Sequence, residues 1–433
     1  MLTTESRPVR FGSLLLALGL LLSAANATVA AEEAASPAAG IRKLQSKHLT
    51  LETDLPASKQ VDALPGYFDQ AFAQWCAYFG VDAEQHEDWR ARCYLMRSSE
   101  RFKAAGLLPA DVPEFKSGYT RGDQIWLVDQ SSEYYRRHLL LHEGTHAFMY
   151  GLVGAACSPW YFEGVAELLA THRLDSDKLT LGYFPRSREE VPKLGRIEIV
   201  QAGYAARRAM SLAKILAYDQ TAHFQNEPYG WCWAAAAFLD GHPRYRERFR
   251  QLSGWAREPD FAQRVNKLFA ADADRLNEDW QLFVANLDYG YDFARMDVDL
   301  VAGKPLGDGS ARVSVAADRG WQSSGVQLQA GRKYHLRASG RYQIALEPRA
   351  WMCEPGGVTI RYYHGQPLGI LLAAVRSDDA KATGSNGLLK PIVVGLETTF
   401  ESPRTGTLYL RVNDSAGSLA DNAGTLDVEI VAE

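Results

Sequence analysis

The sequence predicts an α+β protein in two parts, a mixed region whose long helices follow its strands and a C-terminal all-β domain. Two short apolar runs, Cys93 to Met96 and Ile125 to Val128, are typical of buried strands. From Leu139 onward, apolar residues recur at spacings of three and four, which is the period of a helix that buries one face. Beyond about Met296 the pattern changes to short alternating runs separated by Gly, Pro and Asn-Asp turns. Strands followed by helices indicate the α+β class, and the later alternation favours a β-sandwich.

The N-terminal segment differs in kind from the rest of the chain. Arg7 and Arg10 precede an apolar run from Leu14 to Leu22, and small residues follow up to Ala31. This pattern is typical of a secretory signal peptide, and its apolar core is shorter than the roughly 20 residues of a membrane span. We expect a signal peptide over residues 1–31, a secreted or periplasmic mature protein, and no transmembrane segment after cleavage. An uncleaved signal anchor is the alternative.

The remaining boundaries follow from changes in composition. A small-residue linker occupies residues 32–46, the mixed region spans 47–294, and the all-β domain spans 295–433. The net charge of −5 is small for 433 residues, and no block of Lys and Arg stands out. We therefore expect no nucleic-acid partner. The five cysteines are odd in number, so at least one cannot pair within the chain.

The helices and strands of the two parts are expected in chain order. In the mixed region, helices are predicted over residues 67–79, 139–150, 160–172, 204–218 and 231–239, and strands over 93–96 and 125–128. In the all-β domain, alternation marks strands around Val326 and Leu328, Leu336 and Ala338, Leu408 to Val412, and Leu426 to Ile430.

A motif with metal-ligand spacing lies on the second of these helices. Residues 142–149 read HEGTHAFM, which places His142 and His146 four apart on one helical face, about 5–6 Å from each other. Both imidazoles can therefore bind one ion, and Glu143 can reach a metal-bound water without being a ligand. The alternative is a helix whose histidines only cap or pack.

A second pair of acidic residues opens the next helix. The stretch WYFEGVAE over residues 160–167 places Glu163 and Glu167 four apart. One carboxylate can complete a His, His, Glu set, and the other can accept the free N–H of a ligand histidine. A solvated acidic face is the alternative, but the interleaved Trp160, Phe162 and Val165 disfavour it.

Together the two motifs resemble the gluzincin metallopeptidases, the broad clan that contains thermolysin and the zinc aminopeptidases. The resemblance covers roughly residues 60–290. It implies a zinc-dependent enzyme in which His142, His146 and Glu163 are the ligands, Glu143 is the general base and Glu167 orients a histidine. It also implies a peptide or protein substrate, which would lie along the strand QIWLVD at residues 124–129 as the edge of the sheet.

Members of this clan place a Tyr or His over the developing oxyanion. Tyr229 begins a helix in a similar position, and Tyr204, Tyr218 and His223 are its rivals. No Gly-x-Met-x-Asn type segment for binding a free amino terminus is present, which favours an endopeptidase.

A polar loop near the C-terminus is a candidate calcium site. Asp414, Asp421 and Asn422 lie between two predicted strands and carry the oxygen ligands that Ca²⁺ prefers, although Asn-Asp sequences also form plain turns. This region resembles the small calcium-dependent galactose-binding bacterial lectins, in which Asp414, Ser418, Asp421 and Asn422 fall on ligand positions. The resemblance implies a carbohydrate or glycoprotein partner. The chain departs from that family at the tyrosine ligand, for which Tyr342 or Ile344 lies nearby, and at its sugar loop, which residues 364–367 only partly match.

The sequence therefore predicts an exported zinc metallopeptidase with a lectin-like β-sandwich domain. The alternative is an exported binding protein that keeps the metallopeptidase fold and has lost its activity.

Overall fold

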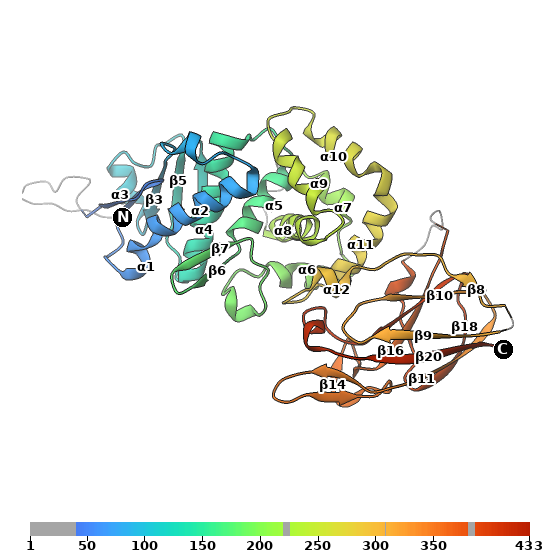
Figure 1. Ribbon diagram of the computed structural model, residues 1–433. Coiled ribbons are helices and arrows are strands. Elements are labelled where there is room, and N and C mark those ends of the chain that lie inside the picture. The colour runs from blue at the N-terminus through green and yellow to red at the C-terminus, as the bar shows by residue number, and fades with distance from the viewer. Residues whose placement is uncertain (1–39, 220–225, 308, 380–385) are drawn as a thin grey trace, which may run out of the picture.

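A computed structural model describes residues 40–219, 226–307, 309–379 and 386–433. The chain is α+β, and its elements form a mixed region followed by C-terminal sheets (Figure 1). The predicted signal peptide, the start of the predicted linker, and His223 lie outside these residues. Across these same ranges, no helix is long and apolar enough to cross a membrane, and the five cysteines, all within them, are free thiols.

A five-stranded sheet forms one side of the mixed region. Its strands are β1 (Arg42–Gln45), β2 (Leu49–Thr53), β3 (Ala91–Met96), β4 (Gly118–Arg121) and β5 (Gln124–Val128), in the order β1-β2-β3-β5-β4. β2, β3 and β5 are parallel, whereas β1 and β4 pair antiparallel at the two edges. The apolar runs predicted the interior strands β3 and β5, whereas the third interior strand, β2, was not predicted.

Both edge strands differ from the sequence-based expectation. β1 lies within the segment 32–46 that was assigned to a linker, and β4, not the QIWLVD strand, forms the edge beside β5. The expectation that QIWLVD is the edge strand is therefore wrong. The strands RKLQ and GYTR each carry one apolar residue apart from glycine. Polar edge strands of this kind show no alternation of apolar and polar residues, so the sequence does not reveal them.

Helices α2 (Leu64–Phe79) and α4 (Glu133–Phe148) pack closely against each other. Gly144 makes this possible, because a Cβ at that position would lie 2.7 Å from the ring of Phe68 and 2.8 Å from that of Trp75. The Ser132 side chain caps α4 by accepting from the Tyr135 amide, and after Phe148 the chain continues as one π-helical turn, Met149–Val153. Single π turns inside helices often occur at functional sites.

The second helical layer contains α5 (Pro159–Ala170) and α8 (Asn226–Gly241). At Gly164 a Cβ would lie only 2.6 Å from the Cys232 carbonyl oxygen, so the glycine lets the two helix backbones approach. The helix predicted over 204–218 is instead two, α6 (Arg196–Ala205) and α7 (Leu212–Leu216). The break follows from Arg207, whose φ of 57° lies in the left-handed region and ends the helical path.

The remaining elements of the mixed region contain none of the candidate site residues. They are α1 (Lys59–Asp62), α3 (Ser99–Ala104), the hairpin β6 (His172–Asp175) and β7 (Lys178–Leu181), α9 (Arg246–Gln251), α10 (Phe261–Phe269), α11 (Ala273–Asn286) and α12 (Phe293–Met296).

The C-terminal part consists of two main sheets around a shared apolar core. One sheet has the strand order β17-β16-β19-β10-β8 and the other β18-β11-β20-β9. The strands are β8 (Lys304–Pro305), β9 (Ser310–Ala316), β10 (Gln322–Leu328), β11 (Lys333–Ser339), β12 (Tyr342–Ala345), β13 (Trp351–Cys353), β14 (Val358–Tyr363), β15 (Gln366–Leu368), β16 (Leu371–Arg376), β17 (Ile392–Val393), β18 (Glu397–Glu401), β19 (Gly406–Val412) and β20 (Thr425–Ala432).

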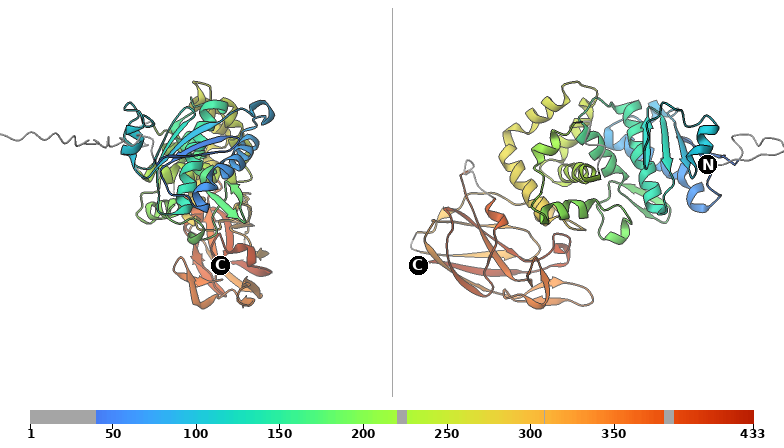
Figure 2. Two further views of the ribbon diagram at one scale, coloured as in Figure 1. Left: turned by 90° about the vertical axis from the view of Figure 1, so that its left-hand side faces the viewer. Right: turned by 180° about the vertical axis from the view of Figure 1, so that it is seen from behind.

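The two parts contact each other through the loop between β19 and β20. Figure 1 and the views in Figure 2 place the C-terminal sheets beside α11 and α12, away from the five-stranded sheet. Ala416 and Leu419 of this loop are fully buried in the core of the mixed region. Ser415 Oγ donates to Asp288 Oδ2 at 3.1 Å, and the Asp292 amide donates to the Ala416 carbonyl at 3.1 Å.

Candidate metal centre

Three ligand atoms from α4 and α5 meet at one point. His142 Nε2 and His146 Nε2 lie 3.1 Å apart, and Glu163 Oε2 is 3.3 Å from the first and 3.4 Å from the second. A tetrahedral ion with bonds of about 2.0–2.1 Å separates neighbouring ligand atoms by about 3.3–3.4 Å. The three atoms therefore have the spacing of one face of such a tetrahedron, and the group could hold a metal ion.

The buried side chains of His142 and Glu163 shift each other's pKa values. Burial lowers the pKa of His142, but the carboxylates of Glu163, Glu167 and Glu143 outweigh that effect and raise it to about 9. Burial likewise raises the pKa of Glu163, but the two histidines outweigh it and hold this pKa far below its ordinary range. The carboxylates thus retain a proton on His142, which a bound metal would replace.

Glu143 lies beside this group and is held by the edge strand β4. Thr120 Oγ1 donates to Glu143 Oε2 at 2.7 Å and lies 3.1 Å from the Glu143 carbonyl oxygen. A Cβ at Gly118 would lie 2.5 Å from Glu143 Oε1, so only glycine leaves room for the carboxylate. Neither contact could be predicted from the sequence, because β4 precedes Glu143 by more than twenty residues.

The substitution Gly118→Ala is expected to displace the Glu143 carboxylate and to leave the ligands in place. If Glu143 is the base, kcat should fall by up to about 10²-fold, the cost of misplacing a reacting group by about 1 Å, while metal content stays unchanged. Gly66→Ala is the matched control, because a Cβ there meets no atom within 4 Å. Wild-type kcat in Gly118→Ala, measured on a peptide substrate, would contradict the role of this contact.

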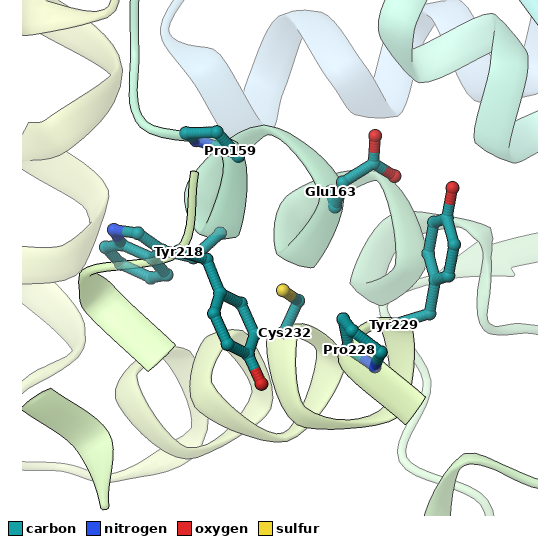
Figure 3. A pocket seen from close by; sticks show the side chains of 7 residues that line it. Pro159, Glu163, Tyr218, Pro228, Tyr229 and Cys232 are labelled. Carbon is teal, nitrogen blue, oxygen red and sulfur yellow. The ribbon is translucent and has the colours of Figure 1, made fainter. Parts of the chain in front are cut away.

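Tyr229 is the candidate tyrosine that lies at the centre. Its ring centroid is 6.2 Å from that of His142. Burial, followed by the charges of Glu163 and Glu143, raises the pKa of Tyr229 well above its ordinary value, so its hydroxyl stays protonated and able to donate. Figure 3 shows a pocket lined by Glu163, Tyr218, Tyr229 and Cys232, in which this hydroxyl and the Glu163 carboxylate point toward the same side.

Two of the three rivals can be compared with Tyr229. The Tyr218 hydroxyl points away from Glu163 in Figure 3 and donates to Met210 Sδ at 3.3 Å. Tyr204 is 39% exposed. His223 lies outside the described residues.

Two aromatic residues beside the ligands were not foreseen from the sequence. Phe162 stacks on the ring of His146 with centroids 4.2 Å apart, and Tyr150 packs edge-on against Phe162 at 5.3 Å. Tyr150 is 45% exposed, so this aromatic pair borders the centre on an open side. Helical spacing contained the signal, since Tyr150 is four residues after His146 and Phe162 directly precedes Glu163.

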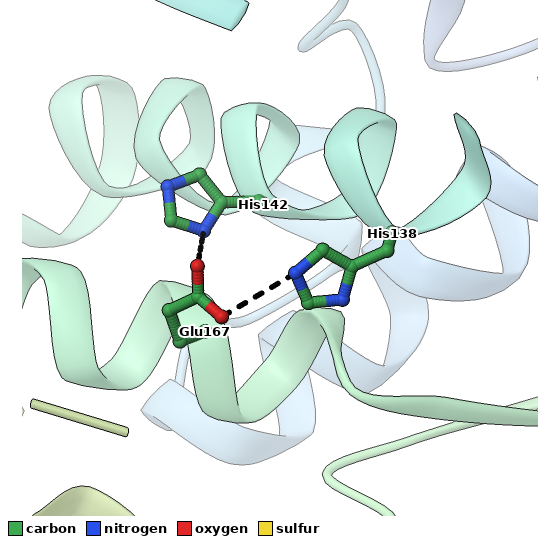
Figure 4. Close-up of side chains that lie close together, drawn as sticks. All are labelled: His138, His142 and Glu167. Carbon is green, nitrogen blue, oxygen red and sulfur yellow. Dashed lines mark ion pairs between the residues drawn. The ribbon is translucent and has the colours of Figure 1, made fainter. Parts of the chain in front are cut away.

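Glu167 lies behind the ligands. Its Oε1 is 3.4 Å from His142 Nδ1, the ring nitrogen that faces away from Glu163, and its Oε2 is 3.4 Å from His138 Nε2 (Figure 4). Glu163 therefore faces the Nε2 atoms of both His142 and His146, whereas Glu167 faces the other ring nitrogen, Nδ1, of His142.

The C-terminal loop brings three of its four candidate calcium residues together. Asn422 Nδ2 donates to Asp414 Oδ2 at 3.0 Å, and Asp421 Oδ2 accepts from the Leu346 amide at 3.2 Å. Among the described residues, Asp421 Oδ1 and Asn422 Oδ1 are buried without a hydrogen-bond donor, as expected of oxygens arranged for a cation. Burial raises the pKa of Asp414 to about 6. Ser418 is half-buried and begins the turn that leads to Asp421.

The two sugar-binding features of the lectin resemblance differ in their positions. The turn at residues 364–367 lies beside the loop, because Asn413 Nδ2 donates to the Gln366 and Pro367 carbonyl oxygens at 3.2 and 3.0 Å, whereas the candidates for the tyrosine ligand are buried. Tyr342 is fully buried and donates to the Gly369 carbonyl at 2.6 Å, and Ile344 is also buried in the core. Part of the loop surface packs against residues 288–292, which leaves less of it open to a ligand.

No family model and no curated protein matches this sequence. Several solved structures are similar to parts of it, including the following three. The N-terminal domain of EclA, a PllA-like lectin, is 26% identical with a TM-score of 0.22, over 28% of this chain and 95% of that one. PliG of Aeromonas hydrophila, a periplasmic inhibitor of g-type lysozyme, is 11% identical with a TM-score of 0.18. The match covers 32% of this chain and 98% of that one. IMPa of Pseudomonas aeruginosa, in complex with an O-glycopeptide, is 13% identical with a TM-score of 0.18, over 58% of this chain and 25% of that one. These likenesses are too distant to decide a function, so the site itself carries the argument.

Proposed function

We propose that the chain is an exported zinc-dependent peptidase of gluzincin type that hydrolyses internal bonds of peptide or protein substrates. The observation that carries the proposal is the convergence of His142 Nε2, His146 Nε2 and Glu163 Oε2 within 3.1–3.4 Å. Two imidazoles and one carboxylate are a ligand set that suits Zn²⁺ and leaves a fourth tetrahedral position for water.

The surrounding side chains supply the other steps of hydrolysis. A zinc ion in this group would polarise the scissile carbonyl and lower the pKa of bound water to about 7. Glu143 takes a proton from the attacking water and passes it to the leaving amine as the C–N bond breaks. The protonated hydroxyl of Tyr229 donates to the negative charge that develops on the carbonyl oxygen.

The edge strand β4 indicates how a peptide would bind. An extended chain can add to a sheet edge through main-chain hydrogen bonds. β4 is the outer strand of the sheet, and its residues Gly118 and Thr120 touch the Glu143 carboxylate. A peptide paired with β4 would therefore place a backbone carbonyl next to the base.

Hydrolysis of casein by the purified chain tests the proposal. We expect hydrolysis that a zinc chelator abolishes and that added Zn²⁺ restores. Stoichiometric zinc without hydrolysis of casein or of a mixed peptide library would instead favour the alternative, an exported binding protein without activity.

Export itself is part of the proposal and rests on residues 1–31 of the sequence. N-terminal sequencing of the protein recovered from the periplasm or the medium tests it.

The C-terminal sheets are proposed to form a lectin-like module that binds Ca²⁺ through Asp414, Ser418, Asp421 and Asn422 and through it a glycan or glycoprotein. The support is the pair of buried oxygens without donors in the loop. Because this loop also contacts Asp288 and Asp292, a bound ion would strengthen the contact between the two parts of the chain.

Calcium is expected to raise the thermal midpoint of the full chain, by the equivalent of about 2.7 kcal/mol at one hundred times Kd. Because the folded-state pKa of Asp414 is raised to about 6, ionisation of this carboxyl costs stability as pH rises through that value. A cation removes that cost, so the gain should be larger at about pH 8 than at about pH 5. Zinc is kept at the same concentration throughout, and the two scans differ only in added calcium.

The double variant Asp414→Asn with Asp421→Ala should lose the calcium gain, whereas Asp427→Asn on the neighbouring strand β20 should keep it. Equal midpoints with and without calcium would make the loop a plain turn. Addition of galactose to the calcium-loaded chain tests the glycan separately.

A further inference from the structure

The carboxylate of Glu167 is held at both oxygens by one arginine. Arg196 Nη2 donates to Oε1 at 2.7 Å and Arg196 Nε donates to Oε2 at 2.8 Å. Each oxygen also faces one histidine of α4, as Figure 4 shows for His142 and His138. The side chains of Arg196 and Glu167 are only 11% and 3% exposed. This is a buried two-point contact, the strongest form of an arginine–carboxylate pair.

The cluster of His138, His142 and Glu167 also has ligand atoms close enough to hold an ion. A second metal is nevertheless disfavoured there, because the guanidinium of Arg196 already donates to both oxygens and its positive charge repels a cation. The arrangement is better suited to orienting His142, which needs an acceptor for its Nδ1–H when Nε2 binds a metal.

We propose that Arg196 is a positioning residue of the metal centre, which fixes the Glu167 carboxylate so that Glu167 in turn fixes the ring of His142. The inference rests on the proposed function. Arg196 also lies over the Tyr229 ring, with its guanidinium carbon 5.7 Å from the ring centre. One side chain of α6 thus supports both a ligand histidine and the candidate oxyanion donor.

The shape of the guanidinium is essential to this role. Its planar fork matches both oxygens of a carboxylate at once, whereas the ammonium of lysine is a single point charge on a flexible stem. The last torsion of a glutamate side chain is soft, so a carboxylate held at one oxygen can rotate. Arg196→Lys therefore keeps the charge and removes the constraint.

The test compares Arg196→Lys and Arg196→Met with the wild-type full chain. Zinc affinity is measured by competition with a chromophoric chelator, and ligand geometry by the absorption spectrum of the Co²⁺-substituted protein. We expect about 10- to 100-fold weaker zinc binding and an altered cobalt spectrum in both variants. Arg136→Lys is the matched control, because Arg136 is also a mostly buried arginine, paired with Asp129 at 2.6 Å. It should bind zinc as the wild type does.

A double-variant comparison shows whether Arg196 acts through Glu167. In a Glu167→Ala background, Arg196→Met should cause little further loss of zinc affinity, because the residue it positions is gone. Additive losses, or wild-type zinc affinity and cobalt spectrum in both Arg196 variants, would overturn the inference while leaving the proposed function intact. A wild-type chain that binds no zinc would overturn both.

Discussion

Glu143→Gln is expected to keep the zinc ion and to lose about 10²- to 10⁴-fold in kcat, the usual contribution of a positioned base. The ligand atoms of His142, His146 and Glu163 are unchanged by the substitution. The amide oxygen can still accept from Thr120 Oγ1, which donates to Glu143 Oε2 at 2.7 Å. What disappears is the capacity to take a proton from water.

The measurement pairs zinc content with steady-state hydrolysis on the same preparation. Glu133→Gln is the control, because Glu133 is an exposed residue in the first turn of the same helix. Hydrolysis at the wild-type rate by Glu143→Gln would show that another group acts as the base.

The two glutamates of α5 are expected to respond unequally to removal. Glu163→Ala should abolish stoichiometric zinc, because Glu163 Oε2 lies 3.3 and 3.4 Å from the two Nε2 atoms. Glu167→Ala should weaken zinc binding only about 10- to 100-fold, the typical effect of a group that orients a ligand. His146→Ala should lose both zinc and hydrolysis.

Zinc titration of the chelator-treated proteins separates these cases. Glu189→Ala, which changes an exposed carboxylate, serves as the control for loss of negative charge. Equal losses in the two α5 variants, or a larger loss in Glu167→Ala, would reverse the assignment of the two residues.

The parts of the site that sequence could predict are those set by helical periodicity. His142 and His146, and separately Glu163 and Glu167, are four residues apart, so each pair shares a helical face wherever the helix packs. The meeting of the two faces is a tertiary contact between α4 and α5, whereas Gly144 and Gly164 let α4 approach α2 and α5 approach α8. Their presence inside the motifs was visible, but what they pack against was not.

The contacts that sequence could not predict join elements without a local signal. Thr120 and Gly118 reach Glu143 from an edge strand whose composition resembles a loop. Arg196 reaches Glu167 from a helix that begins 29 residues later, and nothing near Arg196 marks it as different from other arginines. Such pairs depend on tertiary packing, which no periodicity encodes.

In the C-terminal part too, the strands could be predicted from the sequence, whereas the contact made by the loop could not. Alternation of buried residues identified strands such as β11 and β20, because side chains of successive residues point to opposite faces. The loop between β19 and β20 was recognised from its polar residues, but its docking through Ala416 and Leu419 onto the mixed region was not. Small apolar residues within a polar loop give no indication of which surface will bury them.

X-ray absorption at the zinc edge tests the central claim most directly, because it reports the identity and distance of the atoms around the metal. For the zinc-loaded wild-type chain we predict one ion per chain, bound only by nitrogen and oxygen at about 2.0–2.2 Å. The spectrum should show two imidazoles bound to the zinc, and His146→Ala should lose the zinc signal. Sulfur at about 2.3 Å, or wild-type zinc content in His146→Ala, would contradict a centre formed by His142, His146 and Glu163.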